Sequence, residues 1–186
     1  TGEQNDQIQL VVNNGTADTL TSSTDLTAGQ WYHVAGIWDG TDMSIYIDGI
    51  LDNTKVSTTA AQNSSETLII GARDDTGSNS FNGVIDEARI WSAALDAADI
   101  DDLRDFICQK INTTHLYFAD LEGYWRFDEN NATACADSSG NQNHGTLNAV
   151  RVCSTAPIGD ASDHDYAGGS GGCAGPLRAG ARSAKA

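Results

Sequence analysis

Basic residues and long apolar runs are both scarce in this sequence. It contains ten Lys and Arg against twenty-six Asp and Glu, which gives a formal net charge of −16 at pH 7. Nucleic acids and anionic membrane surfaces attract positive patches, so neither is an expected partner. No run approaches the roughly 20 apolar residues that cross a bilayer, so membrane insertion is not predicted. The first residues also lack the basic-then-apolar pattern of an export signal, and we expect a processed or excised chain.

Cysteine is infrequent, and its spacing is not that of a zinc site. None of the four cysteines forms a Cys-x-x-Cys pair. Isolated cysteines in turn-rich sequence favour disulfides, which predicts a secreted or cell-surface location. Three pairings remain open among Cys108, Cys135, Cys153 and Cys173. We favour Cys135 with Cys153 because they flank a predicted strand and its turn, a loop whose closure is worth roughly 3 kcal/mol in the chain-entropy model.

The motifs of several enzyme classes are also missing. The sequence has neither the Gly-x-Ser-x-Gly of serine hydrolases nor the His-Glu-x-x-His of zinc peptidases. Polysaccharide hydrolases need two carboxylates that face each other roughly 5–10 Å apart. Here the acids Asp86 and Glu87 are adjacent in a predicted strand and therefore point to opposite faces. The sequence thus predicts a protein that is not an enzyme.

Short segments rich in β-branched and aromatic residues recur between turn signals such as Asn-Gly and Asp-Gly. This rhythm is typical of an antiparallel β-sandwich. The predicted strands span residues 8–12, 31–38, 44–47, 67–70, 84–91, 123–127 and 145–152. One helix is expected over residues 99–108, with Asp96 as its N-cap. The predicted fold class is therefore all-β, with one short α-helix.

Four blocks closely resemble laminin G-like domains. They are Trp-Tyr-His-Val-Ala at 31–35, Trp-Asp-Gly at 38–40, Ile-Tyr-Ile-Asp-Gly at 45–49 and Phe-Asn-Gly-Val-Ile-Asp-Glu-Ala-Arg-Ile-Trp at 81–91. The resemblance covers about residues 2–103 and implies a concanavalin A-like jelly roll, an antiparallel β-sandwich of two sheets packed face to face. It also implies extracellular recognition, the usual task of such domains.

The order of the segments departs from the family pattern. The chain begins where such a domain has already formed its first strands, whereas residues 121–129 and 137–147 resemble the opening strands of the same family. These later strands either complete the first sandwich or start a second repeat. We favour completion because the connection is short, and strand exchange with a neighbouring copy is the alternative. The predicted segments are the first domain at 1–106, a connector at 107–120, the opening strands at 121–166 and a flexible Gly/Ala/Ser-rich tail at 167–186.

Oxygen-bearing side chains form a candidate calcium site. Asp86 stands in an apolar row of its predicted strand, and a buried carboxylate needs hydrogen bonds, a charged partner or a metal ion. A turn-rich segment that could lie beside that strand offers the carboxylates and amides of Asp128, Asp137, Asn141 and Asn143. Calcium is therefore a candidate cofactor, as the resemblance also implies. The alternatives are a structural bond for Asp86 and a polar turn of Asx motifs for the others.

We interpret the chain as a non-catalytic extracellular recognition or adhesion module. Its expected partner is a glycan or an extracellular protein. Exposed aromatic side chains could stack on sugar rings, although most of the aromatics are expected in the core. The alternative function is a structural spacer or assembly subunit of a surface filament or multiprotein complex.

Overall fold

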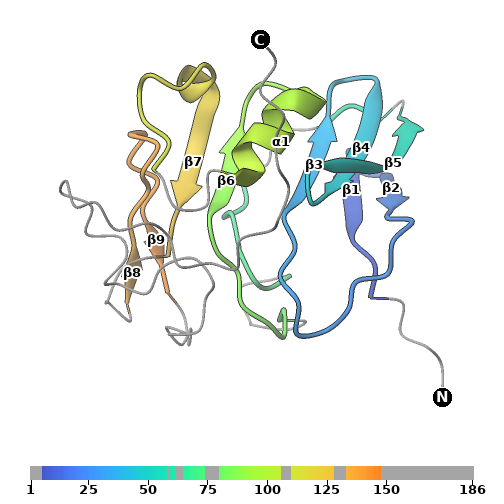
Figure 1. The fold of residues 1–186 in the computed structure, drawn as a ribbon, viewed down its shortest axis with the longest axis horizontal. Helices are drawn as coiled ribbons and strands as arrows, with labels where there is room; N and C mark the ends of the chain where they lie inside the picture. Colours follow the sequence, from blue (N-terminus) through green and yellow to red (C-terminus); the bar gives the residue numbers. More distant parts are fainter. Residues whose placement is uncertain are drawn as a thin grey trace, which may run out of the picture.

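The computed structural model describes residues 6–57, 59–61, 65–73, 80–105, 110–127 and 133–147. Within these residues the strands form antiparallel pairs only, accompanied by helix α1 and a single turn of 3-10 helix (Figure 1). The predicted fold class, a concanavalin A-like antiparallel sandwich with one short α-helix, is confirmed. The helices in the described part are both too short to cross a bilayer.

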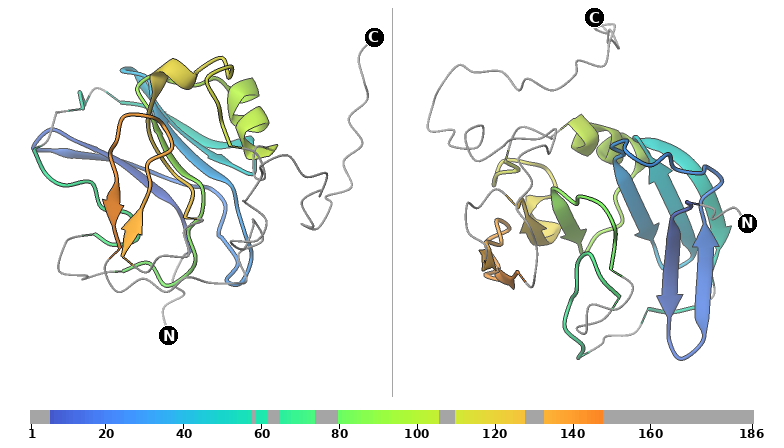
Figure 2. Two further views of the ribbon diagram at one scale, coloured as in Figure 1. Left: turned by 90° about the vertical axis from the view of Figure 1, so that its left-hand side faces the viewer. Right: turned by 90° about the horizontal axis from the view of Figure 1, so that it is seen from below.

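A hairpin packs against a three-stranded sheet to form the first core. Strands β1 (Gln9–Asn13) and β2 (Ala17–Thr21) pair across the turn that contains Gly15. They cover the sheet of β3 (Val34–Trp38), β4 (Asp42–Ile47) and β5 (Ile50–Val56), and Figure 2 shows the two layers. Because side chains alternate along a strand, one face of β4 meets the hairpin. The buried residues between these layers are Val12, Leu20, Met43, Ile45 and Ile47.

The opposite face of the same sheet forms the second core. Tyr46 points away from the hairpin and packs with residues of α1 (Ala97–Asp105) and β7 (Leu121–Trp125). Tyr124 is fully buried there. Removing large apolar side chains from water stabilises the fold by roughly 1.5–3 kcal/mol each. The helix therefore holds the three-stranded sheet and β7 together.

The predicted N-cap of the helix is confirmed, and α1 begins at Ala97, two residues before the predicted start. The Asp96 carboxylate accepts the N–H of Ala98 at 2.8 Å and that of Asp99 at 3.0 Å, as an N-cap does. These bonds lower the pKa of the Asp96 carboxyl, and the bond from Asp99 has the larger effect. Ile100 and Leu103 face the core.

The later part of the chain pairs with the earlier part. Strand β6 (Ala88–Trp91) is antiparallel to β7, which follows η1 (Phe118–Asp120). Strands β8 (Ala134–Cys135) and β9 (Gly145–Thr146) form a short pair beyond β7. Strands β6 and β7 thus pair within the chain. Completion of the first sandwich and the domain boundaries stay predictions. The predicted tail, and residues 148–152 of the last predicted strand, lie outside the described residues.

Three details of the strand prediction were wrong. Residues 67–70 form no strand, and none of the described strands pairs with them. The strand predicted at 84–91 begins only at Ala88, since Glu87 has a positive φ of 54° that interrupts the extended backbone. Strands β2, β5 and β8 were missed, because β2 and β5 contain polar residues at several positions and β8 has only two residues.

Candidate functional site

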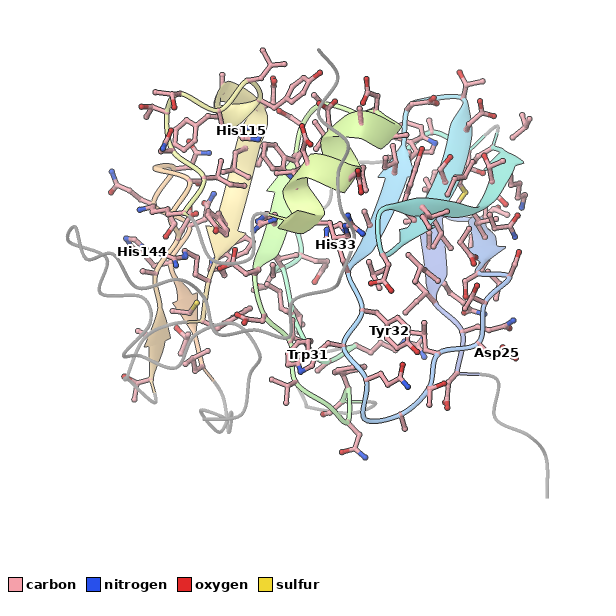
Figure 3. The ribbon with its side chains drawn as sticks, viewed as in Figure 1. Asp25, Trp31, Tyr32, His33, His115 and His144 are labelled. Atoms are coloured by element: carbon pink, nitrogen blue, oxygen red, sulfur yellow. The ribbon has the colours of Figure 1, made fainter. Side chains whose placement is uncertain are left out.

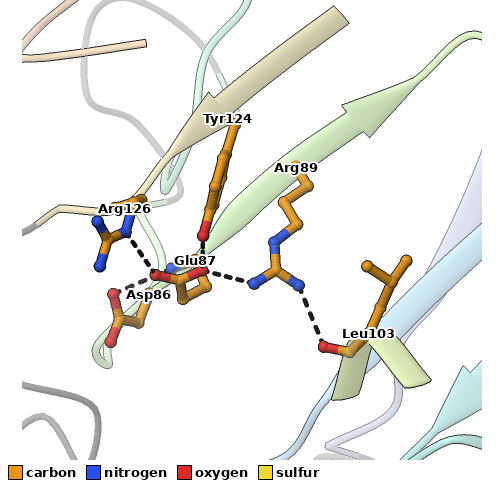
Figure 4. Close-up of polar contacts among 6 residues, drawn as sticks. All are labelled: Asp86, Glu87, Arg89, Leu103, Tyr124 and Arg126. Atoms are coloured by element: carbon orange, nitrogen blue, oxygen red, sulfur yellow. Dashed lines mark hydrogen bonds and ion pairs between the residues drawn. The ribbon is translucent and has the colours of Figure 1, made fainter. Parts of the chain in front are cut away.

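One polar cluster surrounds the carboxylate of Glu87 (Figure 4). Its Oε2 accepts bonds from the Tyr124 hydroxyl and from Nη2 of Arg89, each at 2.5 Å. Nε of Arg126 lies 3.4 Å from Oε1. The Glu87 and Arg89 side chains are both 8% exposed. Two arginines and a hydroxyl thus neutralise and bind one buried carboxylate, as such a group requires.

The same cluster ties three elements together. Nη1 of Arg89 donates to the main-chain oxygen of Leu103 in α1 at 3.2 Å, and its guanidinium lies 5.0 Å from the ring centre of Tyr124. Burial raises the pKa of Tyr124 well above its ordinary value; the charge of Arg89 opposes the rise and that of Glu87 adds to it. Tyr124 therefore stays protonated and acts as a donor. The arrangement joins β6, β7 and α1 rather than leaving an acid poised for chemistry.

A second polar cluster is centred on Asp137, next to β7. Oδ1 accepts the main-chain N–H groups of Tyr124 at 3.0 Å and Ser139 at 2.9 Å. Oδ2 accepts the Ser139 hydroxyl at 2.8 Å and the N–H of Asn143 at 2.9 Å. Burial alone would raise the pKa of Asp137, but these hydrogen bonds outweigh it and hold the pKa below its usual value.

Two further predicted ligands belong to this turn. Nδ2 of Asn141 donates to the main-chain oxygen of Leu121 at 2.9 Å, and Nδ2 of Asn143 donates to that of Glu122, also at 2.9 Å. The structure therefore brings Asp137, Asn141 and Asn143 together, at the edge of β7. Their bonds match the Asx-turn alternative, and calcium binding by this set stays a prediction.

Of the remaining predicted ligands, Asp86 does not join that turn. Asp86 lies beside Glu87, at the hydroxyl end of Tyr124, whereas Asp137 binds the main-chain N–H of the same residue. Oδ1 of Asp86 accepts the N–H of Glu87 at 3.0 Å, a structural bond of the kind weighed for it. Asp128 lies outside the described residues. Within the described ranges, no group of three acidic, His or Cys side chains could hold a metal ion.

His33, immediately before β3, is partly buried. Its main-chain N–H donates to Oδ1 of Asp48 at 3.1 Å, and its main-chain oxygen accepts the N–H of Asp48 at 2.8 Å. Nδ1 is buried and has no hydrogen-bond partner among the residues that the structure describes. Burial and the nearby charge of Arg89 lower its pKa to about 4. Figure 3 shows His33 at the lower end of α1.

Trp31 differs from the other three tryptophans. Trp38 and Trp91 pack against the two cores and Trp125 is buried. Trp31, in the loop that leads into β3, belongs to neither core and is 38% exposed. It lies at the lower end of the molecule in the view of Figure 3, opposite His115. An exposed indole is a surface on which an apolar sugar face can stack.

The sequence reasoning missed the Glu87 cluster. It placed Asp86 rather than Glu87 inside, because it assumed an extended backbone up to Trp91. One signal was available in the sequence: Glu87 and Arg89 stand at alternate positions, and a second arginine follows at 126. Charged residues are rarely buried unless they are paired, so such a set indicates a buried ion pair.

One cysteine is described. Cys135, in β8, is buried. Cys108, Cys153 and Cys173 lie outside the described residues, so every disulfide pairing stays a prediction.

Comparison with known proteins gives the family and the fold. The family model described as the concanavalin A-like lectin/glucanases superfamily matches residues 2–101. A structure from Bacteroides ovatus, named a "putative carbohydrate binding protein", superimposes with a TM-score of 0.55 at 21% identity; the match covers 74% of this chain and 40% of that one. An S-layer domain-containing protein from Clostridium thermocellum matches with a TM-score of 0.37 at 22% identity, over 56% of this chain and 65% of that one. No curated protein sequence matches significantly.

Proposed function

Because this chain belongs to the concanavalin A-like lectin/glucanase superfamily, we propose that it is a non-catalytic module that binds carbohydrate outside the cell. The superfamily contains lectins and glucanases, so its architecture serves both sugar binding and sugar cleavage. The name of the similar Bacteroides ovatus structure is consistent with the binding role. Isolated cysteines and an acidic composition support an extracellular location.

The observation that carries the proposal is the exposed indole of Trp31. Large aromatic side chains offer 150–250 Å² of contact area, and the exposed part of the Trp31 indole is available to a ligand. The neighbouring loop also presents polar groups. The Tyr32 hydroxyl lies 3.1 Å from the N–H of Thr27 and 3.2 Å from Oε1 of Gln30. An aromatic platform beside hydroxyl and amide groups has the composition of a sugar subsite.

The non-catalytic part of the proposal rests on the state of the buried acid. Hydrolysis of a glycosidic bond uses two carboxylates that face each other across the substrate. The Glu87 carboxylate is already bound by Tyr124, Arg89 and Arg126. An acid held in this way supports the fold and is poorly placed to accept or donate a proton.

The experiment is a glycan array, repeated with and without calcium, on the full chain and two variants. We expect a subset of glycans to bind, and Trp31→Ala to weaken that binding at least tenfold. Stacking of a nucleic-acid base on an aromatic ring is worth roughly 1–3 kcal/mol, and we take the same order for a sugar face. Leu116→Ala is the matched control, because this side chain is 80% exposed and is adjacent to His115 at the opposite end.

Three results would contradict the proposal. Absence of binding to any glycan would favour the structural spacer. Release of reducing ends from a polysaccharide would show an enzyme. Equal binding by the Trp31→Ala and parent proteins would place the sugar elsewhere.

A further inference from the structure

The dipeptide Asn-Gly occurs twice in the chain, at Asn14-Gly15 and at Asn82-Gly83. All four residues are exposed. Asparagine is thermolabile, because its side-chain amide can react with the main chain. The main-chain nitrogen of the next residue loses its proton and attacks Cγ, a C–N bond forms, and ammonia leaves, which gives a cyclic imide. Glycine favours this attack because it has no Cβ to shield its nitrogen.

The first pair lies in the hairpin turn between β1 and β2, which holds its reacting atoms. The N–H of Gly15 donates to Oδ1 of Asn13 at 2.8 Å, and Oδ1 of Asn14 accepts the N–H of Thr16 at 3.4 Å. Asn13 and Ala17 are paired on the two sides of the turn. The Gly15 nitrogen must leave its hydrogen bond before it can attack, so the turn has to open locally first.

The second pair lies in the segment that leads into β6. Residues 80–87 belong to none of the described strands. Within the described ranges, no hydrogen bond involves the N–H of Gly83 or the side chain of Asn82. Attack by the Gly83 nitrogen therefore does not require a hydrogen bond or a strand pair to break first.

We propose that Asn82 is a site of spontaneous deamidation, with water as the co-reactant, and that the fold protects Asn14. Water opens the cyclic imide at either carbonyl, so the net reaction replaces the side-chain NH2 by a carboxylate oxygen and releases ammonia. One product is aspartate. The other is isoaspartate, in which the main chain passes through the side-chain carbon and is longer by one CH2.

The modification changes the charge at one end of the molecule. The segment that leads into β6 runs to the lower end of the view in Figure 1, and Figure 3 shows Trp31 at the same end. The formal net charge of the chain changes from −16 to −17, because an uncharged amide becomes a carboxylate. A modified chain therefore presents a more negative potential at the end where Trp31 is exposed.

The test compares the two pairs in the full chain, kept folded at mildly alkaline pH and, in parallel, unfolded in guanidinium chloride. Trypsin separates the pairs because Lys55 and Arg73 lie between them, and fragmentation mass spectrometry then locates each replacement of NH2 by OH. In the folded chain we expect Asn82 to react at least tenfold faster than Asn14. In the unfolded chain we expect similar rates, because the hydrogen bond of Gly15 and the strand pairing are lost.

Variants test the source of the protection. Asn13→Ala removes the acceptor of the Gly15 N–H and should speed the reaction at Asn14 at least threefold. Thr16→Ala is the matched control, because it changes the same turn but keeps the main-chain N–H that Asn14 accepts. Asn82→Gln should remove the fast-forming product, since glutamine would have to close a larger ring.

The comparison of folded and unfolded parent chain does not depend on whether a variant folds. The proposal is overturned if Asn82 stays unmodified in the folded chain, or if Asn14 reacts there as fast as Asn82. It is also overturned if the ratio of the two rates is the same in guanidinium chloride, since the local sequence rather than the fold then sets it. An unchanged rate at Asn14 in Asn13→Ala would overturn the protective role of the Gly15 hydrogen bond.

Discussion

Acid should destabilise this protein through His33 before it protonates most of the carboxylates. The imidazole lies between β3 and α1, and its Nδ1 is buried without a partner among the described residues. Its pKa is about 4 in the folded chain against 6.5 for an ordinary histidine, chiefly because burial penalises the charged form. As the pH falls through 6.5, the unfolded chain binds a proton that the folded chain still refuses.

The size of the effect follows from linkage. The difference of 6.5 minus about 4 is about 2.5 in pKa, and each step of one in pKa corresponds to 1.36 kcal/mol. His33 therefore contributes roughly 3 kcal/mol to the free energy of unfolding above pH 6.5. This contribution is lost as the pH falls from 6.5 to about 4, because in that window the unfolded state binds more protons than the folded state.

The assay is urea unfolding at a series of pH values for the parent protein and for His33→Gln. Glutamine does not titrate, so the difference between the two unfolding free energies should shrink or reverse by roughly 3 kcal/mol between pH 7 and pH 4. The carboxylates whose pKa is lowered are common to both proteins and cancel in this difference; they are Asp18, Asp39, Asp96 and Asp137. Two parallel curves, or an imidazole titration midpoint near 6.5 by NMR, would refute the reasoning.

Three further predictions concern the polar clusters. Asp137→Ala leaves three main-chain N–H groups without their acceptor and should lower the unfolding free energy by roughly 3 kcal/mol in urea melts. Asp25→Ala, at an exposed position, is the control and should change it little; equal losses from the two variants would contradict the role of the turn. Glu87→Gln removes the charge that compensates two largely buried arginines and should lower the free energy of unfolding by roughly 3 kcal/mol in urea melts. Tyr124→Phe removes one donor and should lower it by about 1 kcal/mol; a larger loss for Tyr124→Phe than for Glu87→Gln would contradict the geometry. Because four donors already occupy the Asp137 oxygens, we expect a chelator to leave the Tm unchanged, and a clear fall in Tm would establish the calcium site predicted from the sequence.

The strands that the sequence predicted well share a local signal. β4 alternates large apolar residues with others, and a turn containing Asp48 and Gly49 ends it. The φ of Gly49 is 80°, and a side chain there would come within 2.8 Å of the Asp101 carboxylate, so glycine is required. Such patterns depend on neighbouring residues alone, and a sequence displays them directly.

The candidate site was harder to predict, because its bonds join segments far apart in the chain. Asp137 attracted notice as a polar turn, and this much was visible in the spacing of its neighbours. That its carboxylate also binds the main chain of Tyr124 depends on β7 lying beside the turn. Glu87 was expected outside because its row also holds Arg89, but the two side chains pair with each other and are both 8% exposed.

The sequence by itself determined the family, the all-β class and the capped helix, because turn residues, periodicity and capping act within a few positions of the chain. The tertiary structure alone decided which carboxylates are buried, why the pKa of His33 is lowered and that β6 pairs with β7. These properties depend on desolvation and on contacts between distant segments, for example between Glu87 and Arg126, and no local pattern encodes them.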